Sequence, residues 1–129
     1  MDVTTLAALV FAVAACAVVA FQLALALGAP WGLFAMGGAF PGQFPAPMRI
    51  AAAVQGLVIA FLGLGVLSAA RVALPELAVS FPWLVWVAVA VSVVALVMNA
   101  MSRSAGERRI WLPVTLVLLF SSLLVALAR

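Results

Sequence analysis

Four long apolar runs dominate this chain, and its few charged residues lie in the short stretches between them or at the ends. Each run approaches or exceeds about 20 residues, the length a helix needs to cross the hydrocarbon core of a bilayer. Hydrophobic residues make up 70% of the 129 residues and charged residues only 7%. A chain this short cannot hide so much apolar surface from water. The sequence therefore predicts an integral membrane protein.

One polar stretch, residues 99–109, separates the last two apolar runs and contains three arginines and one glutamate. We interpret it as a hairpin at a membrane surface, with one spanning helix entering and the next leaving. Within it, Ser104-Ala-Gly-Glu107 fits a capping box. In that motif the serine oxygen accepts a first-turn amide and the glutamate reaches back to the amide of the serine.

The fold predicted from these runs is all-α, an integral membrane bundle of four transmembrane helices in a single domain, residues 1–129. The expected helices cover about residues 3–27, 47–70, 81–101 and 105–128. A cleaved signal peptide is the competing interpretation of the first run, because Ala24-Leu-Ala26 resembles a cleavage site. We keep the run as a helix, since it is too long for a signal sequence and Asp2 replaces the usual basic residues.

Individual residues mark the expected helix ends and membrane interfaces. Ser80 is the expected N-cap of the third helix, and Trp83 and Trp111 are expected interfacial anchors. Pro113 is expected to kink the fourth helix or to shorten its regular portion. Arg49 falls in the first turn of the second helix, where a cation opposes the helix dipole. We therefore expect lipid phosphate or an acidic partner to compensate its charge.

Residues 28–46 form a loop that is rich in glycine and proline, so no long helix continues through it. The loop is nevertheless apolar and aromatic, which favours a position at the membrane interface. The alternative is a re-entrant loop that dips into the bundle and lines a cavity. Against this alternative, Gln43 is the only polar side chain that the loop offers to a cavity.

Small residues recur at every fourth position of the first run, a pattern that lets another helix approach closely. The stripe consists of Ala8, Ala12, Cys16, Ala20, Ala24 and Gly28. Chance is the alternative explanation, because alanine is abundant in this chain. On the third expected helix, one face should turn inward; it carries Ala88, Ser92, Ala95 and Asn99.

The polar hairpin and the start of the second helix lie on the same side of the predicted bundle, so their polar residues form a candidate site. These residues are Arg49, Asn99, Ser102, Arg103, Ser104, Glu107 and Arg108. We hypothesise that Glu107 pairs with Arg49 or Arg103, and that the remaining arginines bind anionic lipid headgroups. The simpler interpretation is that Glu107 only caps its helix and the arginines only set the topology.

A second candidate set lies within the predicted spans, where uncharged polar side chains need hydrogen-bond partners. We expect interhelical contacts from Gln22, Gln55, Ser92, Thr115 and Ser122, together with Asn99. A polar path for a small solute or ion is the functional alternative. The predicted spans carry no ionisable residue at mid-membrane, which argues against a proton-coupled carrier.

The residue types that most enzymes and metal sites need are scarce. The chain has no histidine, one cysteine, and three carboxylates in three different segments. We find no catalytic constellation and no metal or cofactor site. The net charge of +3 is normal for the loops of a membrane protein and does not indicate nucleic-acid binding.

Two segments carry a family resemblance: Ala26–Gly32 with Gly37-Gly38 and Pro45–Arg49, and Asn99–Arg108 followed by Pro113. On these segments and the helix spacing, nearly the whole chain resembles a family of small bacterial four-helix membrane proteins whose activity is uncharacterised. The resemblance implies the four-helix membrane fold and supplies no catalytic or ligand residues.

The leading functional hypothesis is a non-enzymatic membrane protein that acts through helix packing with lipid or with partner proteins. The alternatives are a small homo-oligomeric transporter or channel, and a lipid-modifying enzyme, for which Glu107 is the sole plausible acid or base. We expect the bacterial cytoplasmic membrane as the location. Three arginines in loop 102–109 and Arg49, directly after loop 28–48, lie on one side, and two arginines lie on the side of the termini. This distribution favours cytoplasmic loops and outside termini.

Overall fold

The computed structural model describes residues 1–129 and is entirely helical, without strands, so the prediction of an all-α fold is confirmed. The long helices are α1 (Val3–Ala26), α2 (Ala46–Ala69), α4 (Leu84–Ala100) and α5 (Ala105–Ala128). The short helices are η1 (Gly32–Phe34), η2 (Met36–Gly38) and α3 (Pro75–Ser80).

Three of the helices, α1, α2 and α5, are long and apolar enough to cross a membrane. Each has 24 residues, which corresponds to a length of about 36 Å. Helix α4 is also apolar but has 17 residues, or about 25 Å. Large hydrophobic side chains such as Leu57, Val94 and Phe120 are exposed on α2, α4 and α5. This exposure fits a protein whose helices are surrounded by lipid.

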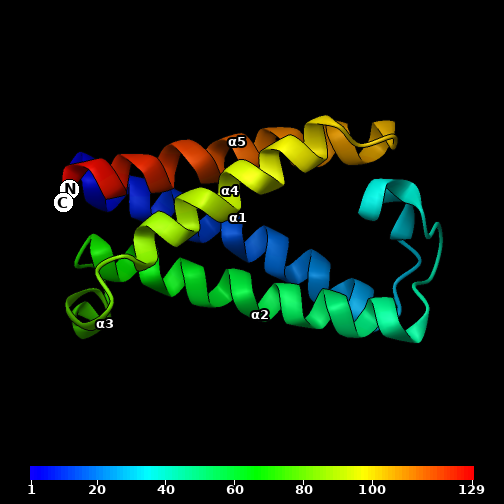
Figure 1. Cartoon of the computed structure of the whole chain (residues 1–129), viewed down its shortest axis with the longest axis horizontal. Helices are drawn as coiled ribbons and strands as arrows, with labels where there is room; N and C mark the ends of the chain where they lie inside the picture. Colours follow the sequence, from blue (N-terminus) through cyan, green and yellow to red (C-terminus); the bar gives the residue numbers. More distant parts are fainter.

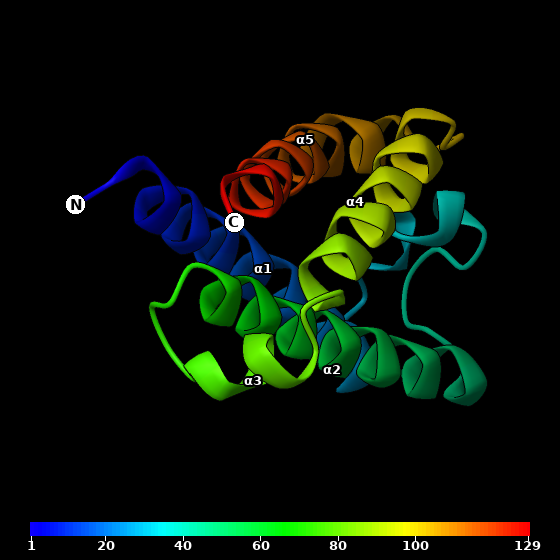
Figure 2. The ribbon, with the colours of Figure 1, turned by 60° about the vertical axis from the view of Figure 1, so that its left-hand side comes forward.

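The long helices form two antiparallel pairs, α1 with α2 and α4 with α5 (Figure 1). The pairs meet at the end of the molecule that holds both termini and diverge toward the opposite end (Figures 1 and 2). The connecting loop, residues 27–45, lies between the diverging ends. We call the end with the termini, where the pairs meet, the closed end, and the opposite end the divergent end. Most of the buried core is at the closed end and includes Phe11, Leu62, Val66, Leu84, Leu118 and Val125.

A glycine allows α2 and α4 to touch at the closed end. A Cβ atom at Gly65 would lie 2.7 Å from Cδ2 of Leu84, closer than carbon atoms normally approach. The side chain of Leu84 therefore packs directly on the backbone of α2. This contact belongs to the packed core that joins the two helix pairs. The pairs separate only toward the end of the molecule opposite the termini.

Helix α3 was not predicted from the sequence. Pro75 occupies a position in its first turn, where proline is tolerated because the amide there has no helical partner. Ser68 of α2 fixes the segment in place: its Oγ donates to the carbonyl of Leu74 at 2.6 Å and accepts the amide of Ala78 at 2.7 Å. A buried hydroxyl thus satisfies backbone groups on both sides of the turn.

One prediction about a helix end is corrected by the structure. Ser80 is the last residue of α3 and does not cap the next helix, which begins at Leu84. The break lies at Pro82, which has no amide hydrogen and therefore cannot donate to the carbonyl of an earlier turn. Helix α5, in contrast, continues through Pro113 to Ala128, so this proline does not shorten the helix.

The small-residue stripe predicted on α1 is not the face that this helix buries within the chain. Cys16 and Ala20 of the stripe are exposed, whereas Phe11 and Ala15 outside the stripe are buried. Only Ala8 belongs both to the stripe and to the core. Helix α1 packs against two neighbours, α2 and α5, so its buried surface follows the groove between them. A single line of small residues does not predict such a surface.

Candidate functional site

A cavity of about 520 Å³ lies between the two helix pairs where they diverge. All four long helices and the connecting loop contribute to its wall, and most of the lining residues are hydrophobic. The polar side chains in the wall are Gln22, Gln55, Asn99, Glu107, Trp111 and Thr115. The volume falls within the range of about 300–1,000 Å³ that is typical of small-molecule sites.

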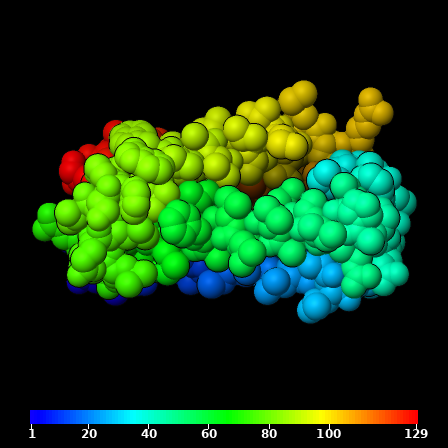
Figure 3. Space-filling view, turned by 60° about the horizontal axis from the view of Figure 1, so that its bottom comes forward, coloured from blue at the N-terminus to red at the C-terminus, as the bar shows by residue number.

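The cavity opens sideways, between α2 and α4. Val54 and Val58 of α2 line it and remain exposed, as do Val94 and Met98 of α4. These helices lie on the face turned forward in Figure 3, with α2 in green and α4 in yellow-green to yellow. The opening is therefore bordered by apolar side chains that fit contact with lipid chains.

A second depression, of about 340 Å³, lies between α1 and α5. Its wall offers no polar group that could orient a ligand. It consists only of aliphatic side chains, those of Leu9, Val10, Val13, Ala14 and Val117. The cavity at the divergent end is the better candidate because it combines apolar walls with polar groups.

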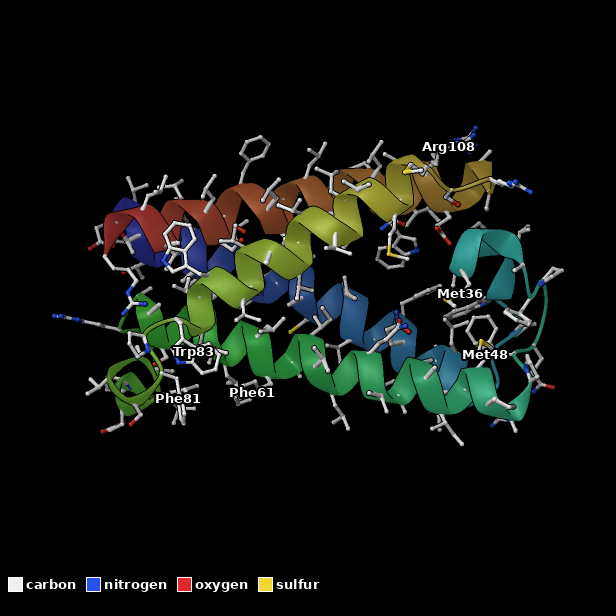
Figure 4. All side chains as sticks on the ribbon, viewed as in Figure 1. Met36, Met48, Phe61, Phe81, Trp83 and Arg108 are labelled. Carbon is white, nitrogen blue, oxygen red and sulfur yellow. The ribbon has the colours of Figure 1, made fainter.

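A left-handed turn in the connecting loop faces the cavity between the two helix pairs. Met36, Gly37 and Gly38 all have positive φ, at 53°, 67° and 79°. Two consecutive glycines make such a turn accessible, while Met36 adopts it at a cost of about 1 kcal/mol. Figure 4 shows Met36 in the loop and Met48 below it at the start of α2. Both methionines line the cavity.

The connecting loop caps the start of α5 through Ser104. The Oγ of Ser104 accepts the amide of Glu107 at 3.1 Å and donates to the carbonyl of Leu33 at 2.7 Å. Half of the predicted capping box is thus confirmed. The other half is wrong, because the amide of Ser104 donates to the Oγ of Ser102 and the Glu107 carboxylate turns to the loop.

Trp111 attaches the loop to the second turn of α5. Its indole Nε1 donates to the carbonyl of Phe34 at 3.1 Å, and its ring lies 4.7 Å from the ring of Phe21 between centroids. A Cβ atom at Gly106 would lie 2.6 Å from Cε1 of Phe34, so the glycine makes room for this ring. Trp111, which we predict to be an interfacial anchor, is partly buried, and its N–H donates to an acceptor within the protein.

Glu107 is buried, with 6% of its surface exposed, and its carboxylate lines the cavity. Oε2 accepts the amide of Gly37 at 3.1 Å, and Oε1 accepts no hydrogen bond from the protein. The predicted pairing of Glu107 with Arg49 or Arg103 is wrong, because no arginine lies within ion-pair distance of it. Its only protein partner is a neutral backbone amide.

Arg49 is engaged at the end of α1 instead. Its Nε donates to the carbonyl of Ala26 at 2.9 Å. A cation near the C-terminus of a helix satisfies free carbonyl groups and interacts favourably with the helix dipole. The charge of Arg49 in the first turn of α2 is thus compensated by the C-terminus of α1. The expected compensation was a lipid phosphate or an acidic partner.

The predicted hairpin site is therefore divided. Arg108 donates to the carbonyl of Ser102 and lies on the outer side of α5, away from Met36 (Figure 4). Arg103 is exposed. Of the seven residues predicted for the site, Asn99 and Glu107 line the cavity, whereas the three arginines do not.

The side chains predicted to bond between helices bond to their own helix or make no bond to the protein. The hydroxyl groups of Ser92, Thr115 and Ser122 donate to carbonyl groups three or four residues earlier, and the amide of Asn99 donates to Ala95. A helical side chain reaches such a carbonyl without help from a neighbouring helix. Gln22 and Gln55 line the cavity without a hydrogen-bond partner in the protein.

Sequence reasoning missed the contribution of the connecting loop to this site. Phe34, Met36 and Phe44 line the cavity, whereas the sequence favours an interfacial loop over the alternative of a loop that lines a cavity. The pair Gly37-Gly38 was the available signal, because consecutive glycines allow a left-handed turn. What the turn would contact was not readable from its own residues.

No group of three or more His, Cys, Asp or Glu side chains lies close enough together to hold a metal ion. Comparison of the chain with protein-family models, with curated proteins and with solved structures finds no match.

Proposed function

We propose that this chain is a non-enzymatic integral membrane protein that takes the hydrocarbon chain of an amphiphile from the bilayer into the cavity between its helix pairs. The observation that carries the proposal is the sideways opening between α2 and α4, bordered by exposed apolar side chains such as Val58 and Val94. A ligand in the surrounding lipid enters such an opening without crossing water. The apolar wall receives the chain of the ligand, and polar groups such as Gln22, Gln55 and Glu107 interact with its head.

In this proposal α4 crosses the membrane with the other three long helices, which gives four spans in a bacterial cytoplasmic membrane. Loops 28–48 and 102–109 face the cytoplasm and the termini lie outside, in accordance with the arginine distribution. The exposed side chains of Arg103 and Arg109 contact anionic lipid headgroups at the cytoplasmic surface. A reporter fused after Arg129 tests the orientation, and a cytoplasmic reporter signal contradicts it.

A small homo-oligomeric transporter or channel is the alternative. The packed core that includes Leu62, Val66, Leu84 and Val125 closes the narrow end of the bundle, which argues against a continuous pore through one chain. A flux assay in liposomes, combined with the oligomeric state in nanodiscs, separates the two functions. Flux of a small solute by an oligomer supports the transporter or channel, and a monomeric protein without flux excludes this function.

Fluorescence quenching by a brominated amphiphile tests occupation of the cavity. In one variant Trp31, Trp83 and Trp86 are replaced by phenylalanine, which leaves only Trp111 in the cavity wall. A matched variant retains only Trp83, which is 57% exposed at the other end of the molecule. A single-chain amphiphile with a brominated chain is titrated into bilayers that contain either variant. We expect saturable quenching of Trp111 at low mole fractions and only proportional quenching of Trp83.

A cavity-filling substitution provides the second arm of this experiment. Ala95→Leu adds volume to the cavity wall, whereas Ala60→Leu adds the same volume at an exposed position of α2 outside the cavity. We expect the first substitution to weaken the saturable quenching of Trp111 and the second to leave it unchanged. Equal, proportional quenching of Trp111 and Trp83 contradicts the proposed function.

A further inference from the structure

We infer that the amphiphile bound in the cavity carries a positively charged ammonium head, which Glu107 and the surrounding aromatic rings recognise. This inference rests on the proposed function and specifies its ligand. Its starting point is the carboxylate of Glu107, a side chain in the cavity wall with 6% of its surface exposed; its Oε1 has no hydrogen-bond donor in the protein and remains accessible.

The charge of Glu107 is not balanced within the chain. A carboxylate with little access to water is costly unless a cation or several donors accompany it, and here the protein supplies one backbone amide, that of Gly37. The chain contains no lysine or histidine. Arg49 donates to the end of α1 and Arg108 to the carbonyl of Ser102. A cationic ligand would supply the missing charge.

Aromatic side chains surround the same space. Phe21, Phe34, Phe44 and Trp111 all belong to the cavity wall, and the rings of Phe21 and Trp111 pack at an angle of 53°. The faces of aromatic rings attract ammonium groups, most strongly where water is excluded. A carboxylate beside aromatic rings therefore favours an alkylammonium over a neutral head and repels an anionic one.

Three single-chain amphiphiles with identical brominated chains test the inference in the protein that retains only Trp111. Their heads are trimethylammonium, a neutral sugar and sulfate. The quaternary ammonium is chosen because it keeps its charge at every pH. We expect the trimethylammonium probe to bind about tenfold or more tightly than the neutral probe, and the sulfate probe to bind most weakly.

Glu107→Gln is the matched variant, because its side-chain carbonyl still accepts the amide of Gly37 while the charge is removed. We expect it to lose the preference for trimethylammonium, so that the trimethylammonium and neutral probes bind to this variant within about twofold of each other. Retained binding of the neutral probe shows that the variant is folded. If the variant does not fold, the order of affinity of the three probes for the protein that retains only Trp111 and an intact Glu107 still tests the inference.

Two failures are distinguishable in this experiment. Equal saturable binding of the three probes, or preference for sulfate, overturns the ammonium inference and leaves the proposed uptake of amphiphiles in place. A preference for trimethylammonium that persists in the Glu107→Gln variant also overturns the assignment to Glu107. Absence of saturable quenching by every probe overturns the proposed function itself.

Discussion

Replacing Ser104 with alanine removes both hydrogen bonds that its hydroxyl makes. One is the N-cap bond from the amide of Glu107 at 3.1 Å, and the other is the bond to the carbonyl of Leu33 at 2.7 Å. An N-cap bond contributes about 1 kcal/mol and a hydrogen bond to a carbonyl about 1 kcal/mol more. We therefore expect Ser104→Ala to lower the free energy of unfolding by about 2 kcal/mol.

Ser121→Ala is the matched control, because it makes the same chemical change on the same helix at similar burial. Ser104 is 7% exposed and Ser121 is 6% exposed. The hydroxyl of Ser121, however, bonds only to carbonyl groups of its own helix, at Val117 and Leu118. Bonds of this kind add little to helix stability, so we expect a change of less than about 0.5 kcal/mol.

Reversible unfolding in mixed detergent micelles measures both free energies, and amide hydrogen exchange at Gly37 reports whether the connecting loop stays docked. We expect faster exchange at Gly37 in the Ser104→Ala variant and no change in the Ser121→Ala variant. If the two substitutions change the stability equally, the loop is not held by Ser104 and our account of the divergent end is refuted.

Three further predictions concern other parts of the chain. Gly32→Ala places a Cβ atom 1.8 Å from the carbonyl oxygen of Phe40 and should cost about 3 kcal/mol; an unchanged melting temperature contradicts this packing. The amide and hydroxyl of Thr5 lower the pKa of the Asp2 carboxyl. The cap should therefore persist above the ordinary pKa and be lost as the pH falls through the lowered one, which an NMR titration of Asp2 checks. Cys16, exposed on α1, should resist a water-soluble maleimide in bilayers and react after denaturation, because the polar reagent does not enter the hydrocarbon core.

The helices of this protein were largely readable from its sequence. The expected spans 3–27, 47–70 and 105–128 agree with α1, α2 and α5 within one residue at each end. Their limits depend on local features: the length of an apolar run, a proline or glycine at its end, and a capping residue such as Ser104. The backbone hydrogen bonds of a helix close within four residues, so neighbouring sequence decides where they stop.

The partners of the polar side chains were not readable in the same way. We expected Glu107 to pair with an arginine, and it instead accepts a backbone amide of the connecting loop; the indole of Trp111 donates to a backbone carbonyl of the same loop, which we had not predicted. Arg49 likewise meets the end of α1. A backbone amide or carbonyl is present at every position, so residue types alone do not indicate which one a side chain will reach.

The sequence by itself therefore determined the helical class and the extent of the long apolar helices. Only the tertiary structure decided that the two helix pairs join at one end and separate at the other, and that a loop closes the gap. The contact between Gly37 and Glu107 joins residues 70 positions apart. A cavity forms from the relative angle of packed helices, and that angle depends on contacts between distant residues such as Gly65 and Leu84.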